Sequence, residues 1–189
     1  MKKLSQKILY KGKWINLLDS EFVNDRGEVF NWESTERNNA HQIIIILAKL
    51  VPSNQYILIR QFRPAINKCV IGLPAGIVHD GDINDAAIRE LKEETGYYGI
   101  IKEISPVLAL NPALTSEKVQ IITMEVDEHD SRNKSPEQDL EPEEEIETLL
   151  VPALRTKKYL LEEKAQGHEI GASLWFLFGD IIQEEATQR

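Results

Sequence analysis

The first 40 residues alternate hydrophobic and polar positions in short runs, which predicts β-strands separated by turns. Four runs are rich in β-forming residues, and Asp25-Arg26-Gly27 is a turn signal between the last two. The four runs are Ile8–Tyr10, Trp14–Leu18, Glu21–Asn24 and Val29–Glu33.

The pattern from residue 42 to residue 73 predicts three further strands. Gln42–Leu50 contains four successive isoleucines, which is typical of a strand buried on both faces. Pro52-Ser53-Asn54 is a turn signal, and Tyr56–Phe62 returns as a strand. Val70–Leu73 is a short strand that Pro74 ends.

Helical spacing begins at Ile83 and predicts a helix over Ile83–Thr95. Asp82 suits the N-cap, and Gly96 suits the position that follows the last helical residue. The hydrophobic face consists of Ala87, Ile88, Leu91 and Thr95.

The remaining pattern predicts strands, one long acidic surface loop at Glu128–Glu145 and two helices. The strands are Ile101–Ile104, Val107–Leu110, Val119–Val126 and Leu149–Val151. The helices are Ala153–Ala165 and Gly171–Glu185, with Trp175 expected in the core. We find no repeat and no interdomain linker, so the expected class is α+β, with strands on both sides of a central helix.

Composition narrows the classes of function. The 189 residues suffice for one well-packed domain, and the net charge of −9 argues against a protein that mainly holds nucleic-acid backbone. A small phosphorylated substrate stays possible, because a metal ion can supply positive charge locally. No apolar run approaches the roughly 20 residues that cross a membrane, and no signal-type segment follows the basic N-terminus. The single cysteine, Cys69, excludes an intramolecular disulfide, so we expect a cytoplasmic protein.

The helix at 83–95 carries an unusual acidic cluster. Glu90, Glu93 and Glu94 are spaced i, i+3 and i+4, so they project from one face in the last two turns. A carboxylate at this negative end of the helix dipole is unfavourable by about 0.3–1 kcal/mol. Either Arg89 pairs with Glu93 and leaves an exposed acidic patch, or a divalent cation neutralises the cluster. Carboxylate and carbonyl oxygens suit Mg²⁺ or Mn²⁺.

The residues before the helix favour the second interpretation. Leu73-Pro74-Ala75-Gly76 leads from a strand into a glycine-rich loop, Gly76–Gly81, and then into the acidic helix. Small residues here would let backbone groups approach a metal or a phosphate.

The segment Arg89–Tyr97, RELKEETGY, preceded by Gly76, resembles the Nudix box, G-x5-E-x7-R-E-U-x-E-E-x-G-U, in which U is aliphatic or aromatic. Gln61-Phe62-Arg63-Pro64 and Leu73-Pro74-Ala75-Gly76 are similar to the ADP-ribose and ADP-sugar pyrophosphatase branch of this family. The resemblance implies a Nudix-type α/β/α sandwich with a mixed central sheet over residues 41–189. It implies that residues 1–40 form antiparallel strands used in dimerisation and in contacting adenine.

The resemblance implies hydrolysis of ADP-ribose or a related nucleoside diphosphate sugar to a nucleoside monophosphate and a sugar phosphate. Its implied metal ligands for Mg²⁺ or Mn²⁺ are the Ala75 carbonyl oxygen, Glu90, Glu93 and Glu94, with Arg89 orienting the carboxylates. The implied general base is Glu144 or, second, Glu143, from a loop whose acids are otherwise a solvated run.

Substrate contacts are implied from the same resemblance. Trp14 and Trp32 are candidates for stacking on adenine, one from each subunit of a homodimer, although a tryptophan taken alone is more often a core or interface residue. Glu33 and Arg37 would lie near the base. Arg63 would contact a phosphate, or else form an ordinary salt bridge at a strand end.

The sequence departs from the box in its first half. Asp82 stands at the position of the first glutamate, and the spacing from there to Arg89 is one residue short. Gly72 stands where this branch usually has a glutamate. Two alternatives therefore remain: a Nudix hydrolase of another substrate, such as GDP-mannose or a dinucleotide, and a nucleotide-binding protein that does not hydrolyse its ligand.

Overall fold

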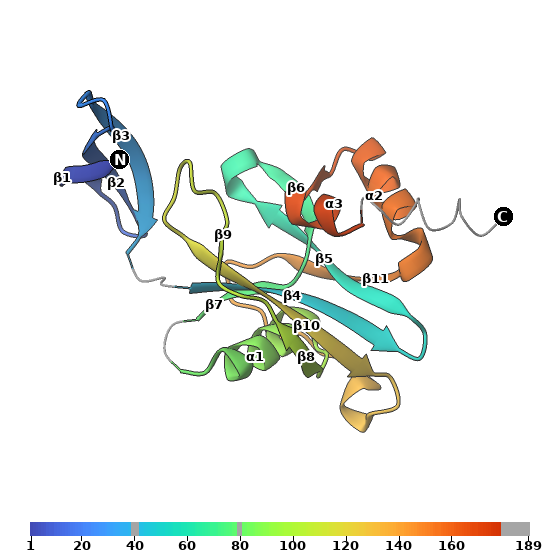
Figure 1. Cartoon of the computed structure of the whole chain (residues 1–189). Helices are drawn as coiled ribbons and strands as arrows, with labels where there is room; N and C mark the ends of the chain where they lie inside the picture. Colours follow the sequence, from blue (N-terminus) through green and yellow to red (C-terminus); the bar gives the residue numbers. More distant parts are fainter. Residues whose placement is uncertain (39–41, 79–80, 179–189) are drawn as a thin grey trace.

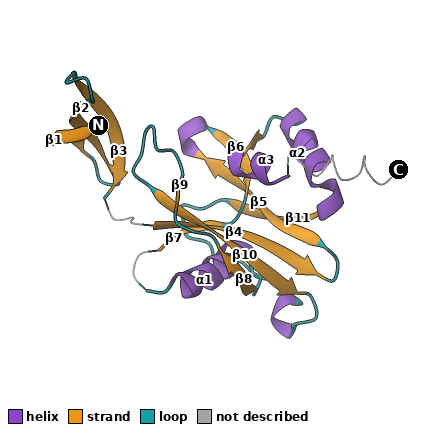
Figure 2. Cartoon of the chain, viewed as in Figure 1, coloured by secondary structure: helices purple, strands orange, loops and turns teal. Residues whose placement is uncertain are grey.

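The computed structural model describes residues 1–38, 42–78 and 81–178. Within these ranges the strands form two sheets, and Figure 1 shows the N-terminal one, in blue, standing apart from the body of the molecule. Figure 2 shows the larger sheet crossing that body with helices on both sides. In the same described ranges, no helix combines the length and the apolar character that a membrane crossing requires.

The N-terminal sheet is antiparallel in the order β1-β2-β3. Its strands are β1 (Lys2–Lys11), β2 (Ile15–Val23) and β3 (Val29–Arg37). The sequence predicted two strands, Trp14–Leu18 and Glu21–Asn24, where the structure has the single strand β2. This strand is continuous because it lies at the centre of the sheet and pairs with β1 and β3 along its length. Asp19, near the expected break, accepts hydrogen bonds from Asn31 at 2.9 Å and pairs with Lys7 at 3.1 Å.

The larger sheet is mixed. Its main path runs β12-β6-β5-β4-β10-β8, while β11 pairs with β5, β7 with β4, and β9 with β10. The pairs β4–β10 and β6–β12 are parallel, and the other pairs are antiparallel. The bounds are β4 Gln42–Val51, β5 Gln55–Arg63, β6 Lys68–Gly72, β7 Ala75–Val78, β8 Ile100–Ile104, β9 Leu108–Ala109, β10 Lys118–Asp127, β11 Ile146–Pro152 and β12 Glu169–Ile170.

The isoleucine run of β4 supplies both faces of this sheet. Ile44 and Ile46 are fully buried in the core that contains Leu91 of α1 (Ile83–Thr95). Ile45 and Leu47 point to the other face and pack against a second core, which includes residues of α2 (Thr156–Ala165) and α3 (Ala172–Phe178). The predicted α+β class with a mixed central sheet is confirmed by the strand pairings. Alternate side chains of β4 pack into the core beside α1 and the core beside α2 and α3.

Helix α1 has the predicted bounds and caps. The Asp82 side chain accepts a hydrogen bond from the Asn84 N–H at 2.9 Å, and Gly96 ends the helix with a φ of 79°. A left-handed residue at this position satisfies a terminal carbonyl, here the Lys92 oxygen, and glycine adopts it without steric cost. Local signals therefore fix both ends of the helix that carries the acidic cluster.

The expected glycine-rich loop at Gly76–Gly81 is wrong at its start, because Ala75–Val78 forms strand β7. Ala75 pairs with Ile45 of β4, and Gly76 pairs with Ile44. This pairing joins segments about 30 residues apart, so the local pattern did not reveal it. Residues 79–80 lie outside the described ranges.

The C-terminal helices differ from the expectation. The predicted helix Ala153–Ala165 begins as a 3₁₀ turn, Ala153–Arg155, and becomes α-helical only in α2. The described part of the last helix is α3, and residues 179–185 of the prediction lie outside the described residues. Trp175 is not a core residue, since it is 42% exposed and Lys157 lies over its ring. The predicted loop at 128–145 is confirmed apart from a 3₁₀ turn at Ser131–Asn133.

Candidate active site

A cleft of about 470 Å³ opens beside the C-terminal half of α1. It is bounded by β3, β4, β5, β7, α1 and the segments before β10 and β11. Its lining residues are Arg37, Ile43, Ile45, Gln61, Arg63, Ala75, Gly76, Ile77, Glu90, Glu94, Leu110, Glu117, Glu141 and Glu144. The cleft thus gathers carboxylates and arginines that lie far apart in the sequence.

Glu94 forms the buried acidic end of the cleft. It is only 4% exposed, and its Oε2 accepts a hydrogen bond from the Ala75 N–H at 2.9 Å. Burial raises the pKa of Glu94 to about 8. The Ala75 hydrogen bond lowers this pKa, and the neighbouring acids Glu90 and Glu144 raise it. A buried carboxylate is stable in its charged form only with a cation nearby.

Arg89 holds the other two acids of the helix. Its guanidinium donates to Glu90 at 2.8 Å and to Glu93 at 2.7 Å. Burial nevertheless raises the pKa of Glu90. Gly76 lies close to Glu90: a Cβ at position 76 would lie 2.0 Å from the Glu90 Cδ, so the Glu90 side chain would have to move. The backbone of β7 therefore passes directly against the Glu90 carboxylate.

The three glutamates do not converge on one point in this structure. Across residues 1–38, 42–78 and 81–178, no group of three or more acidic, histidine or cysteine side chains has metal-ligand spacing. The donor chemistry nevertheless fits a hard divalent cation, since carboxylate oxygens of Glu90 and Glu94 line the same cleft as Ala75. The raised pKa of Glu94 and the close approach of Gly76 to Glu90 mark a place where positive charge would be stabilising.

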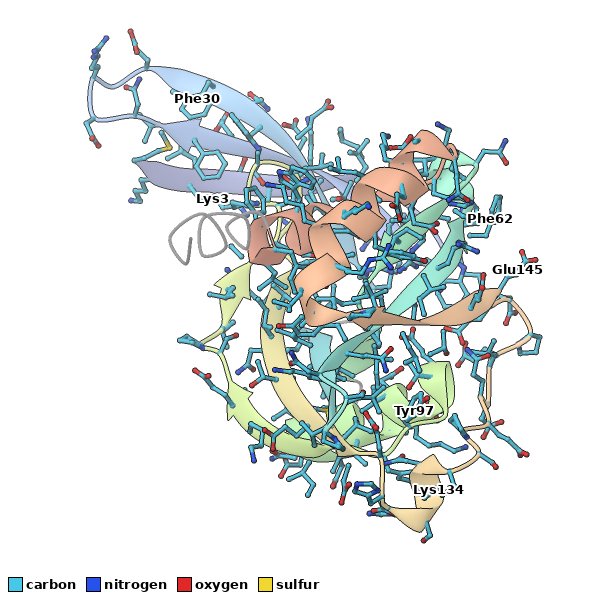
Figure 3. All side chains as sticks on the ribbon, turned by 90° about the vertical axis from the view of Figure 1, so that its right-hand side faces the viewer. Lys3, Phe30, Phe62, Tyr97, Lys134 and Glu145 are labelled. Atoms are coloured by element: carbon cyan, nitrogen blue, oxygen red, sulfur yellow. The ribbon has the colours of Figure 1, made fainter. Side chains whose placement is uncertain are left out.

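The acidic loop before β11 is fastened to the end of α1. The Asp139 N–H donates to the Glu93 carbonyl at 2.9 Å, and the Gln138 side chain donates to the carbonyls of Glu94 and Ile146. Figure 3 shows Glu145 near Phe62 of β5, and the Phe62 N–H donates to the Glu145 carbonyl at 3.3 Å. Both ends of the segment between them are thereby fixed beside the cleft.

Within that segment the structure separates the candidate bases. Glu144 is half-buried, lines the cleft and adds to the negative potential at Glu90 and Glu94. Glu143 is exposed and is not among the lining residues. Glu141, for which the sequence suggested no role, does line it, and its N–H donates to Glu144 at 3.1 Å.

Two arginines provide the positive charge of the cleft. Arg63, at the end of β5, lies close enough to Glu94 to favour its ionised form. Arg37, at the end of β3, forms a salt bridge with Glu117. Sequence analysis missed Glu117, and no local signal marks it, because its partner lies 80 residues away.

The two candidate tryptophans lie outside this cleft. Trp14 is 66% exposed, with the Lys13 ammonium 4.5 Å from its ring centroid. The Trp32 indole donates to the Ala113 carbonyl at 3.1 Å and lines a more apolar hollow of about 530 Å³. Glu33 is exposed and is not among the cleft residues. Within one chain, therefore, Trp14, Trp32 and Glu33 lie outside the acidic cleft, whereas Arg37, the other residue expected near the base, lines it.

A family model described as the NUDIX domain matches residues 40–188. The chain belongs to the Nudix family. It is 32% identical to the ADP-ribose pyrophosphatase of Saccharomyces cerevisiae, over 85% of this chain and 73% of that protein. It is 28% identical to the ADP-sugar pyrophosphatase of Mus musculus, over 78% of this chain and 72% of that protein.

The Nudix fold also has a counterpart among solved structures. A crystal structure described as an ADP compounds hydrolase superposes with a TM-score of 0.67 at 19% sequence identity, covering 85% of this chain and 82% of that one. At this level of identity the likeness shows the fold. The predicted membership of the family is confirmed, and the predicted fold agrees with it.

Asp82 and Gly72, the two residues that depart from the family pattern, have clear places in the structure. Asp82 caps α1, accepting from both the N–H and the side-chain amide of Asn84, and it is not a residue of the cleft. Gly72 ends β6, and a Cβ there would meet nothing within 4 Å. The residue that departs from the box at position 82 therefore serves as the N-cap of α1, whereas Glu90 and Glu94 line the cleft.

Proposed function

We propose that this Nudix protein hydrolyses the diphosphate bond of ADP-ribose or a related nucleoside diphosphate sugar, giving a nucleoside monophosphate and a sugar phosphate. The observation that carries the proposal is the buried Glu94 carboxyl, which shares one cleft with Glu90, Glu144 and two arginines. The names of the yeast and mouse relatives supply the substrate class.

The proposed cofactor is Mg²⁺ or Mn²⁺. Glu90, Glu94 and the Ala75 carbonyl would hold it, with Glu93 contributing once the substrate is bound. When bound, a divalent cation neutralises phosphate charge and lowers the pKa of a coordinated water. Arg89 keeps the Glu90 and Glu93 carboxylates in place through its two hydrogen bonds.

The remaining groups supply proton transfer and binding. Glu144 accepts a proton from the attacking water, since it is the candidate base that reaches the cleft. Arg63 binds the diphosphate oxygens, for which a guanidinium offers paired donors, and Arg37 lies near the base. Arg37 retains Glu117 beside it, so its orientation is set before the substrate arrives.

We propose further that the protein acts as a homodimer. Every residue of β1 is exposed, and apolar side chains including Leu4, Ile8 and Tyr10 face solvent in one chain. An exposed edge strand of this kind favours pairing with another chain. In a dimer, Trp14 of one subunit would reach the adenine in the other, which explains why the tryptophans and the acidic cleft are separate within one chain.

The deciding experiment is product analysis on a substrate panel. ADP-ribose, ADP-glucose, GDP-mannose and a dinucleotide are incubated with the purified protein, with Mg²⁺ added and with EDTA. We expect AMP and ribose 5-phosphate from ADP-ribose, with Mg²⁺ only. Cleavage of GDP-mannose alone would replace the adenine nucleotide by a guanine nucleotide within this class, and cleavage of the dinucleotide alone would refute the class. Binding without any cleavage would identify a nucleotide sensor instead.

A further inference from the structure

Gln61 is a buried polar residue of the cleft for which the proposed function assigns no task. It lies in β5, two residues before Arg63, and only 8% of its surface is exposed. Its side-chain oxygen, Oε1, is buried and has no hydrogen-bond partner among the described residues. A buried acceptor of this kind is rare and requires an explanation.

Packing alone does not explain why a polar amide, and not an apolar side chain, stands at position 61. On the same face of β5, the two residues before Gln61 are apolar: Ile57 is fully buried and Ile59 is 2% exposed. A methionine would fill a similar volume without an unpaired acceptor. Gln61 is one of the residues that line the cleft with Glu90, Glu94 and Ala75, so we look for the missing partner of its oxygen there.

The chemistry of the acceptor narrows the partner. An amide oxygen needs a donor. Ionised phosphate and carboxylate groups offer none, and the Glu94 carboxyl loses its proton when a cation binds. A hydrated divalent cation brings polarised water protons, and Mg²⁺ in particular keeps several waters when it binds to proteins. Such a cation is already proposed in the same cleft, where Glu90 and Glu94 would hold it.

We propose that Gln61 is a positioning residue for the cation, with Oε1 accepting a hydrogen bond from a water of its hydration shell. The inference rests on the proposed function in one respect, the cation site at Glu90 and Glu94. Groups that orient the waters and ligands around a metal typically change its affinity by about 10–100-fold. Gln61 would therefore set how tightly the cation is held before any substrate binds.

The test measures Mn²⁺ binding without substrate, by the electron paramagnetic resonance signal of free Mn²⁺. We expect Gln61→Met to bind Mn²⁺ about 10-fold more weakly than the unaltered protein. Gln61→Glu keeps an acceptor oxygen at the same reach, so it should bind at least as tightly as the unaltered protein. A structural role would not distinguish the two variants in this way.

Thr148→Val is the matched control. The Thr148 hydroxyl is also buried without a partner, and Thr148 lies on the neighbouring strand β11, but it is not a residue of the cleft. We expect Thr148→Val to leave Mn²⁺ affinity unchanged. In the metal-free protein, the melting temperatures of Thr148→Val and Gln61→Met should be no lower than that of the unaltered chain, because each removes an unpaired polar atom.

Equal Mn²⁺ affinity of Gln61→Met and the unaltered protein would overturn the inference and leave the proposed function standing. If the unaltered protein bound no Mn²⁺, the cation site itself would fail, and the two failures are thereby distinguished. Should Gln61→Met not fold, Gln61→Asn replaces it, because the shorter side chain withdraws the amide from the cleft. The same loss of affinity is then expected, and its absence is equally contradictory.

Discussion

Two buried carboxylates lie on opposite faces of the same sheet, Glu94 on α1 and Glu163 on α2, and each is 4% exposed. Glu163 receives hydrogen bonds from Arg60 at 2.9 Å and contacts the His168 ring nitrogen at 2.7 Å. Burial alone would raise the pKa of Glu163, but hydrogen bonds from Arg60, Tyr159 and His168 lower it below its usual value. Burial of Glu94 instead raises its pKa to about 8.

The difference lies in the partners and in depth, because both side chains are covered but Glu94 lies deeper below the protein surface. The charge of Glu163 is already balanced within the protein by its ion pair with Arg60. Arg60 is also paired with Glu147 at 2.6 Å. The hydrogen bond to Glu94 comes from a neutral backbone N–H, and its acidic neighbours oppose its ionisation. A carboxylate kept in so unfavourable a setting is typical of functional sites, where a ligand supplies the missing charge.

The largest expected effect separates the two residues by activity. Glu94→Gln should lower kcat by about 10³-fold, or ~4 kcal/mol in the activation barrier, because it removes a ligand charge that stabilises the transition state. Glu163→Gln, on the opposite face, should keep kcat within about threefold in the fraction that is folded. Steady-state release of AMP from ADP-ribose measures both, and equal losses would remove the distinction.

The candidate bases sharpen the assignment on the Glu94 side. Glu144→Gln should lower kcat by about 10²–10⁴-fold, the usual contribution of a general base. Glu143→Gln, one residue away but exposed, is the matched control and should stay within about twofold. A larger loss in Glu143→Gln than in Glu144→Gln would show that the loop moves before reaction.

Stability should rank the two carboxylates in the opposite order. Glu163→Gln is expected to lower the free energy of unfolding by roughly 2–3 kcal/mol, because it leaves the partly buried Arg60 without its inner partner. Arg60 keeps Glu147, so the loss should be smaller than the roughly 3–5 kcal/mol that breaking a buried ion pair typically costs. In EDTA, Glu94→Gln should be at least as stable as the unaltered protein. Urea unfolding at pH 7 measures both values.

Taken over one pH unit, the smallest expected effect is a dependence of stability on pH in the metal-free protein. The pKa of Glu94 is raised when folded, so between pH 5 and pH 8 the folded state binds more protons than the unfolded state. Stability should therefore fall as pH rises, with a slope of up to ~1.4 kcal/mol per pH unit from this group. Urea unfolding at several pH values in EDTA should show this slope, and Glu94→Gln should lack it.

The sequence was most informative where signals are local. The caps Asp82 and Gly96 fixed α1, and the isoleucine run predicted a strand buried on both faces. Strand β7 was missed because its reason is pairing with β4, which lies about 30 residues earlier. Trp175 was misplaced because helical spacing alone does not show which face of a helix meets the sheet.

The glutamates of the candidate site could be predicted from the sequence. The residues that surround them in the cleft could not. The spacing of Glu90, Glu93 and Glu94 marked the helix, but Arg37–Glu117 is a contact across 80 residues. Gln61 drew attention only as part of a motif, because its unpaired oxygen becomes visible once burial is known. The separation of Glu144 from Glu143 likewise depends on how the loop is fastened to α1.

The central claim, that Glu94 awaits a cation, is tested most directly by counting the protons released when Mn²⁺ binds. A carboxyl with a pKa of about 8 is largely protonated at pH 7 and must lose its proton to become a ligand. Calorimetric titration at pH 7 in buffers of different ionisation enthalpy should therefore show nearly one proton released per Mn²⁺, and Glu94→Gln should release none. Tight Mn²⁺ binding with no proton release, or with the same release from Glu94→Gln, would contradict the account.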